Sequence, residues 1–169
     1  WYRITLGTER TVGIMDFEFK ALTKDGLAAV SADAVLIVLG GNAVPRALDK
    51  ALAALLDDAV AHGDFEFKAN RCLYIHRPAG VAAKRVVFVA AGDASAKAFK
   101  AALVAGLAAL KTAGVTQLAV ARAGFDAALD ESHARALVQA AGDALYVYRH
   151  TKPSASAAMR RATRDRKSV

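Results

Sequence analysis

The sequence predicts an α/β fold, a three-layer α/β/α sandwich built on a mostly parallel mixed sheet. Aliphatic runs of strand length, each ended by a turn or glycine, alternate with segments in which apolar residues recur every three or four positions. Strands that alternate with helices in this way pair in parallel through right-handed crossovers. The 169 residues, 55% of them hydrophobic and only three of them proline, indicate one folded domain with a sizeable core.

Three aliphatic runs predict strands that are buried on both faces. They cover residues 34–39, 85–91 and 117–121. Phe17, Phe19 and Ala21 alternate with their neighbours and predict an amphipathic first strand, added antiparallel to the sheet. Residues 65–67 and 72–75 form a further strand-rich stretch between the first and second helices.

Three segments have the apolar spacing of amphipathic helices. The first has Pro45 in its first turn, where proline is tolerated, and its apolar residues recur from Leu48 to Val60. The second begins after Ser95, a suitable N-cap, and runs to Leu110. Asp130 or Ser132 opens the third, which runs toward Tyr146.

The two ends differ in composition from the rest of the chain. Residues 1–14 have no sustained period, and Met15 would serve as an initiator, so we expect a leader or an added segment outside the fold. Residues 154–169 are first small and then basic, and are expected to form a disordered tail. Neither end is expected to contribute much to stability.

The net charge of +7 is concentrated in the tail, while residues 15–153 carry only +2. The tail cations are Arg160, Arg161, Arg164, Arg166 and Lys167. Because a short arginine-rich tail is more often solvated than a specific binding element, any binding to nucleic acid is expected to be weak and carried by these residues.

The sequence has one cysteine, Cys72, no secretory signal pattern and no apolar run close to the length of a membrane span. These features favour a cytoplasmic protein that does not interact with a membrane. Cys72 lies in an apolar strand with no histidine beside it, which favours a small buried thiol over a nucleophile.

Two glycine breaks are the candidate ligand-binding loops, because each follows a buried strand and precedes a helix. They are Gly40, Gly41 and Asn42, and Gly92 and Asp93. Neither break has the spacing of a dinucleotide-binding fingerprint or the lysine of a P-loop, so a simple chain reversal is the favoured interpretation.

Other reactive side chains lack the spacing that catalysis or metal binding needs. The histidines His62, His76, His133 and His150 are scattered and read as surface or helix-terminal residues. Asp57 and Asp58 are neighbours on a helix, so they diverge by about 100° rather than facing each other. The residues taken one by one predict neither catalytic machinery nor a metal site.

Several segments, taken in order, resemble the N-terminal domain of bacterial leucyl (cytosol) aminopeptidases of the M17 family. They are the start Met15-Asp16-Phe17-Glu18-Phe19-Lys20, the strand at 33–39, the helix end Val60-Ala61-His62-Gly63-Asp64-Phe65, the strand at 85–92 and the exit Tyr146-Val147-Tyr148-Arg149-His150-Thr151-Lys152-Pro153. The resemblance covers residues 15–153, and its specificity lies in the order and spacing of these segments.

The resemblance implies a macro-domain-like sandwich that precedes a larger catalytic domain holding two divalent metals, manganese or zinc. The family's metal ligands and its N-T-D-A-E-G-R motif have no counterpart here, so no catalytic residue, no cofactor in this chain and no activity of this fragment are expected. The implied partners are the catalytic domain of the same polypeptide and the family's hexamer, and the implied role is support of assembly, active-site access or DNA contact. The tail at 154–169 stands where the linker to the catalytic domain would run.

Two other functions remain open. A macro-like sheet also suits a free-standing module that binds a nucleotide such as ADP-ribose, with residues 39–43 in the position of its first loop, although the expected Asn-Ala-Ala-Asn type of loop is absent. A DNA-binding accessory domain is the other alternative.

Overall fold

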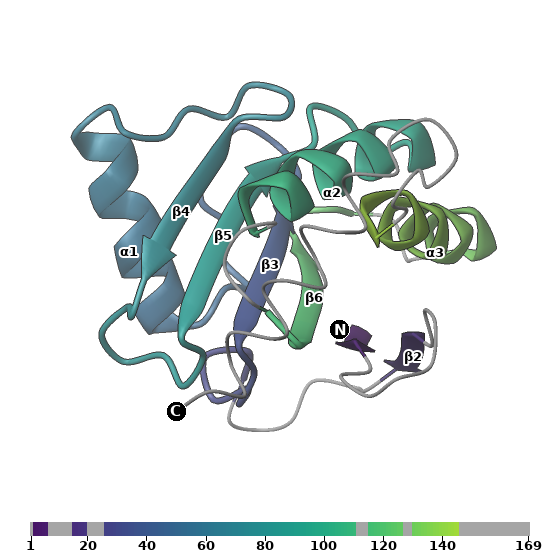
Figure 1. The fold of residues 1–169 in the computed structure, drawn as a ribbon. Helices are drawn as coiled ribbons and strands as arrows, with labels where there is room; N and C mark the ends of the chain where they lie inside the picture. The colour runs from purple at the N-terminus through teal and green to yellow at the C-terminus, as the bar shows by residue number, and fades with distance from the viewer. Residues whose placement is uncertain (1, 7–14, 20–25, 111–114, 127–129, 146–169) are drawn as a thin grey trace, which may run out of the picture.

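The computed structural model describes residues 2–6, 15–19, 26–110, 115–126 and 130–145, the first two ranges as backbone only. Three helices cover a six-stranded sheet in the order β2-β1-β6-β3-β5-β4 (Figure 1). The strands are β1 (Tyr2–Leu6), β2 (Met15–Phe19), β3 (Ala34–Leu39), β4 (Cys72–His76), β5 (Arg85–Ala90) and β6 (Gln117–Ala123). The helices are α1 (Lys50–Ala61), α2 (Ala96–Leu110) and α3 (Glu131–Leu145). The α/β class and the three layers are confirmed.

The three aliphatic runs form the centre of the sheet. β3 pairs in parallel with β5 on one side and with β6 on the other, while β4 is antiparallel to β5. All six residues of β3 are buried, as expected for a strand covered on both faces. Each face carries its own core because successive side chains point to opposite sides of the sheet.

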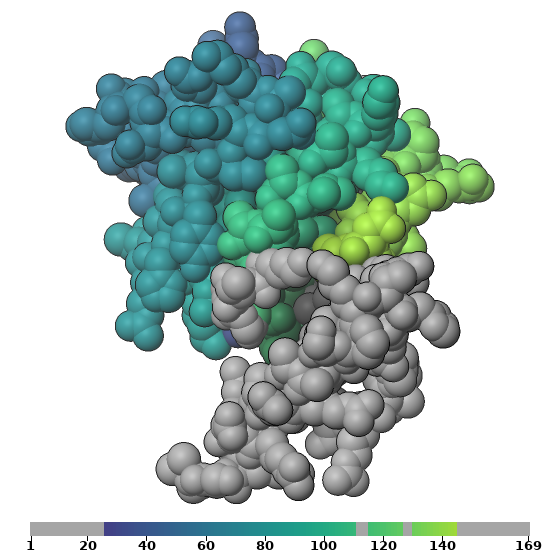
Figure 2. Space-filling view, turned by 45° about the horizontal axis from the view of Figure 1, so that its top comes forward, coloured from purple at the N-terminus to yellow at the C-terminus, as the bar shows by residue number. Residues whose placement is uncertain are grey.

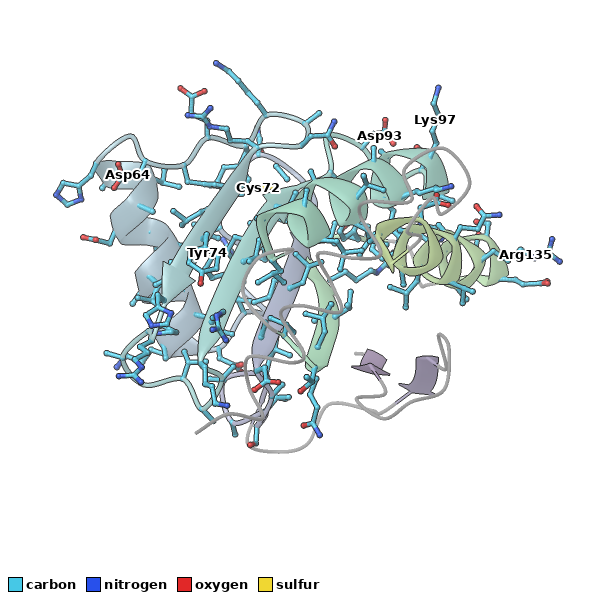
Figure 3. The ribbon with its side chains drawn as sticks, viewed as in Figure 1. Asp64, Cys72, Tyr74, Asp93, Lys97 and Arg135 are labelled. Atoms are coloured by element: carbon cyan, nitrogen blue, oxygen red, sulfur yellow. The ribbon has the colours of Figure 1, made fainter. Side chains whose placement is uncertain are left out.

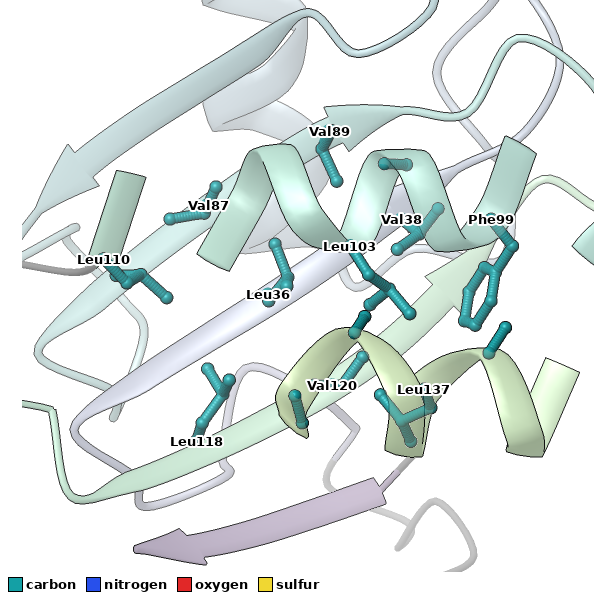
Figure 4. Close-up of a cluster of buried hydrophobic side chains, with 14 of the residues drawn as sticks. Leu36, Val38, Val87, Val89, Phe99, Leu103, Leu110, Leu118, Val120 and Leu137 are labelled. Carbon is teal, nitrogen blue, oxygen red and sulfur yellow. The ribbon is translucent and has the colours of Figure 1, made fainter. Parts of the chain in front are cut away.

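One core lies between the sheet and the pair α2 and α3, and the other lies between the sheet and α1. Leu36 and Val38 of β3 contact the first, where Phe99 and Leu103 of α2 meet Leu137 of α3 (Figure 4). Val35, Ile37 and Leu39 belong to the second core. A single strand thus joins the two apolar layers.

Residues 2–6 correct the expectation that residues 1–14 lie outside the fold. β1 lies inside the sheet, antiparallel to both β2 and β6. Tyr2, Ile4 and Leu6 alternate with two polar residues, but five residues are too short for a local period to predict a strand. The pairing with β6, more than a hundred residues away, makes this segment a strand. The small contribution of the two ends to stability stays a prediction.

Two further expectations from the sequence were wrong. Pro45 does not lie in the first turn of α1, which begins at Lys50; its carbonyl instead accepts a hydrogen bond from Leu48 N (3.1 Å). Residues 65–67 are not a strand, and the aromatic residue Phe65 is buried in a loop against the α1 core. Hydrophobicity there reflects packing rather than strand pairing.

The predicted helix caps are confirmed. Ser95 Oγ accepts a hydrogen bond from Ala98 N (3.1 Å) at the start of α2, and Asp130 Oδ1 accepts one from His133 N (3.1 Å) at the start of α3. None of the helices in the described ranges has the length and apolar character needed to cross a membrane.

Candidate functional site

The two predicted glycine breaks meet at the carboxyl edge of the parallel strands. Gly40–Asn42 follows β3 and Gly92–Asp93 follows β5, and these strands are neighbours in the sheet. Ala91 N donates to Leu39 O over 2.9 Å directly before both breaks. The sequence thus located one edge correctly, although a role of these five residues in binding a ligand stays a prediction.

Gly40 has a structural role that the sequence did not indicate, because it lies against the loop after β6. Its N–H donates to Ala123 O over 2.8 Å. A Cβ added at Gly40 would lie 2.6 Å from Gly124 O, and one added at Gly124 would lie 2.5 Å from Gly40 O. The two backbones are therefore in direct contact, which leaves no room for a ligand between them at this point.

The second break is held in a similar way by the loop before β4. Gly92 has φ +86°, a left-handed conformation that favours glycine, and an added Cβ would lie 2.9 Å from the Cβ of Ala69. Gly41 also has positive φ, at +75°, but an added Cβ would touch only Gly124 O at 3.8 Å. Chain reversal and close packing account for the glycines at both breaks.

The helices that follow this edge have carboxylates at their own N-termini. Asp93 Oδ1 accepts a hydrogen bond from Ser95 N (2.7 Å) in front of α2, and the hydrogen bonds from Ser95 hold the pKa of Asp93 below its usual value. In front of α3, hydrogen bonds from Ser132 and His133 hold the pKa of Asp130 well below its usual value. Because each positive helix end already faces an anionic side chain, its attraction for an anionic ligand is reduced.

The sequence predicted the helix-terminal position of His133 at this edge but not its burial. It lies in the first turn of α3, as a helix-terminal residue would, but it is only 6% exposed. Its Nδ1 contacts Asp130 Oδ1 (2.7 Å), its Nε2 contacts Ala94 O (3.2 Å), and its ring packs edge-on against Phe99. His133 thus joins the starts of α2 and α3. The capping pattern Asp-x-x-His was the available signal.

The other histidine with a defined environment, His62, lies at the C-terminal end of α1, as expected. Its Nδ1 donates to Asp58 O over 2.8 Å, and this bond, together with the Asp58 carboxylate, raises its pKa. Asp57 and Asp58 are exposed, as predicted for a solvated helix face. His76 is exposed at the end of β4.

Cys72 is half-buried at the start of β4, and its thiol donates to Asn70 O over 3.6 Å. Burial raises the pKa of this thiol, which disfavours the nucleophilic thiolate. Within the described residues, no three His, Cys, Asp or Glu side chains are grouped so that they could hold a metal ion.

The tail residues Arg160, Arg161, Arg164, Arg166 and Lys167 lie outside the described residues, as do His150 and Tyr146. Their assignment to DNA contact therefore stays a prediction. The described residues contain a second basic segment that the charge balance of the ends and the body did not indicate. Residues 66–85 contain five lysines and arginines and a single carboxylate, Glu66.

Comparison with known proteins finds the same family that the segments of the sequence resemble. The family model described as the cytosol aminopeptidase family, N-terminal domain, matches residues 30–154. A probable cytosol aminopeptidase of Methylibium petroleiphilum is 55% identical over 144 residues, which are 85% of this chain and 29% of that relative. One of Polaromonas naphthalenivorans is 36% identical over 147 residues, 85% of this chain and 28% of that relative. The chain therefore spans less than a third of the length of these curated relatives.

Proposed function

Because the chain belongs to the cytosol aminopeptidase family, with the family's N-terminal domain at residues 30–154, we propose that it is the non-catalytic domain of a metal-dependent aminopeptidase. In this proposal the domain supports a catalytic domain of the same polypeptide, by assisting assembly into a hexamer or by controlling access of peptides to the active site. The relatives are named cytosol aminopeptidases, which favours the cytosol as the location of this domain.

The observation that carries the proposal is the share of each relative that the match covers. The similarity extends over 85% of this chain but over 29% of the Methylibium relative, and the matching model is the family's N-terminal domain. Most of the relative's length therefore lies outside the region that this chain resembles. We assign peptide hydrolysis to that remaining part.

The implied metals, two manganese or zinc ions, belong to the same remaining part. A two-metal centre needs several carboxylate or imidazole ligands around one point. The described residues do not fit this requirement, because His133, Asp130 and Asp93 are committed to helix caps and no set of three ligands is grouped. No step of hydrolysis is assigned to a residue of this chain.

The chain alone is expected to show no peptidase activity. We would assay the purified protein on leucyl-p-nitroanilide with manganese and then with zinc, next to the full-length Methylibium relative as a positive control. Release of nitroaniline by the relative and none above the buffer blank by this chain is the expected result. Metal-dependent turnover that stays with this chain through repeated purification would overturn the proposal.

Binding of duplex DNA, if measured, is expected to be weak and to depend on residues 154–169. Each phosphate contact releases roughly 0.9 counterion, so five tail cations give a log-log salt slope of at most about −4 to −5. Deleting the tail should remove most of the binding in a filter-retention assay. Retention of DNA at physiological salt by the truncated protein would instead assign DNA contact to the folded surface.

A further inference from the structure

β4 is the last strand of the sheet on its side, and its outer edge has no partner strand among the described residues. Figure 2 shows the teal-blue part of the chain, which includes β4, on the molecular surface, and Figure 3 shows Cys72 and Tyr74 along the strand. Tyr74, at the centre of β4, is 41% exposed. An open edge of this kind is a template for another strand.

The backbone groups that face the open edge can be identified from the register. Arg77 N donates to Lys84 O (2.8 Å) and Ala90 N donates to Arg71 O (3.1 Å), so these two pairs, at the two ends of β4, are hydrogen-bonded. Bonded and non-bonded pairs alternate in an antiparallel ladder. Leu73 and Ile75 therefore bond to β5, while the N–H and C=O groups of Cys72, Tyr74 and His76 point outward.

The charge along this edge is positive. Arg71 and Arg77 flank β4, both exposed and about 20 Å apart along an extended chain. Neither forms an ion pair within the described residues. Arg85 lies opposite His76 in the ladder, and its Nε is buried without a hydrogen-bond partner. The only carboxylate of this segment, Glu66, is paired with Lys68 at 2.7 Å, and its pKa is lowered mainly by Lys68 and to a smaller extent by the charge of Arg71.

This charge argues against a second copy of the chain as the partner strand. Two copies of β4 paired antiparallel about Tyr74 would place Arg71 of one copy opposite Arg77 of the other. Like charges directly opposite each other destabilise strand pairing. A strand with acidic residues near both ends would instead face a cation at each end of β4.

We propose that the open edge of β4 is a docking site for an extended acidic segment of a partner protein, which adds a strand beside β4. Main-chain hydrogen bonds to Cys72, Tyr74 and His76 supply the pairing, as in other cases of strand addition. Arg71 and Arg77 select acidic residues at the two ends of the segment, and Tyr74 pairs with an aromatic or β-branched residue at its centre. Nucleic acid is less suited, because it cannot satisfy an alternating row of N–H and C=O groups.

The first test uses a fluorescein-labelled nine-residue peptide with two glutamates at each end and alternating valine and threonine between them. We expect it to bind the full chain, and we expect Arg71→Glu combined with Arg77→Glu to weaken binding at least about tenfold. The matched control is Lys97→Glu combined with Arg135→Glu, which makes the same charge change at side chains that Figure 3 shows well apart from Cys72 and Tyr74 of β4. This control should change the affinity by less than about twofold.

A second test separates strand addition from charge attraction. Tyr74→Pro removes an outward donor without removing a bond to β5, whereas Tyr74→Ala keeps that donor. We expect the proline variant to lose more affinity than the alanine variant, with melting curves confirming that both are folded. In the unsubstituted protein, amide exchange at Tyr74 and His76 should slow when the peptide binds, while the amides of Leu73 and Ile75 are already protected.

Several outcomes would overturn the proposal. They are equal binding of a peptide with lysines in place of the glutamates, equal binding of a peptide N-methylated at alternate amides, and a concentration-dependent dimer that protects the Tyr74 amide without peptide. Equal protection of that amide by a nine-nucleotide single-stranded DNA would assign the surface to nucleic acid instead.

Discussion

Gly124→Ala is expected to lower the free energy of unfolding by about 2–4 kcal/mol. Gly124 has φ +77°, and an added Cβ would lie 2.5 Å from Gly40 O and 3.0 Å from Pro45 Cγ. A left-handed conformation costs a non-glycine residue about 1 kcal/mol. The remainder comes from forcing apart two loop backbones that hold the ends of β3 and β6, neither of which can move like the end of a flexible side chain.

Gly63→Ala is the matched control, because Gly63 has nearly the same φ, +78°, and nothing lies within 4 Å of an added Cβ. It should cost only about 1 kcal/mol. Urea unfolding of both variants and the parent measures the difference. Equal losses for the two variants would show that the contact between the loops at Gly40 and Gly124 does not constrain the fold.

Asp33→Ala is expected to lower the free energy of unfolding by about 2–3 kcal/mol at pH 7. Asp33 Oδ2 accepts hydrogen bonds from Thr116 N (3.1 Å), Thr116 Oγ1 (2.7 Å) and Gln117 N (3.2 Å), which join the starts of β3 and β6. Removal of the carboxylate leaves two partly buried backbone donors without this acceptor. Lys84→Ala removes only the bond to Oδ1 from a side chain that is 67% exposed, and should cost less than about 1 kcal/mol.

The loss of stability caused by Asp33→Ala should be smaller at low pH than at neutral pH. The bonds from Lys84 and Thr116 hold the pKa of Asp33 well below its usual value, so the folded state binds a proton less readily than the unfolded state. The stabilisation by Asp33 is therefore complete above the ordinary aspartate pKa of about 3.9 and is lost as the pH falls below it. The difference between parent and variant should be constant from about pH 5 to 8 and shrink toward pH 2. A difference that is the same at pH 7 and pH 3 would contradict this account.

Local patterns in the sequence predicted the elements whose structure is indicated by a few neighbouring residues. The aliphatic run of β3 and the caps Ser95 and Asp130 are examples, because a strand buried on both faces and a capped helix each have a short-range signature. β1 was missed because its strand structure depends on β6, and Phe65 was misread because its burial depends on the α1 core.

The candidate site could also be predicted only in part, because its contacts join residues that are far apart in the sequence. The sequence located Gly40 and Gly92 at one edge of the sheet, but the neighbours that require glycine there are Gly124 and Ala69, which no local pattern connects to them. The carboxylate of Asp33 accepts hydrogen bonds from Thr116 and Gln117, which are 83 and 84 positions further along the chain. The basic edge of β4 was missed because charge was summed over the ends and the body rather than over single strands.

The most direct test of the proposed function is the activity of a chimera. In it, residues 30–154 of this chain replace the matching segment of the full-length Methylibium relative, to which the chain is 55% identical. If the domain is non-catalytic and the relative's remaining part hydrolyses peptides, the chimera should retain kcat/KM on leucyl-p-nitroanilide within about tenfold of the relative, a difference of about 1.4 kcal/mol. A folded, metal-loaded chimera without activity would contradict the proposal.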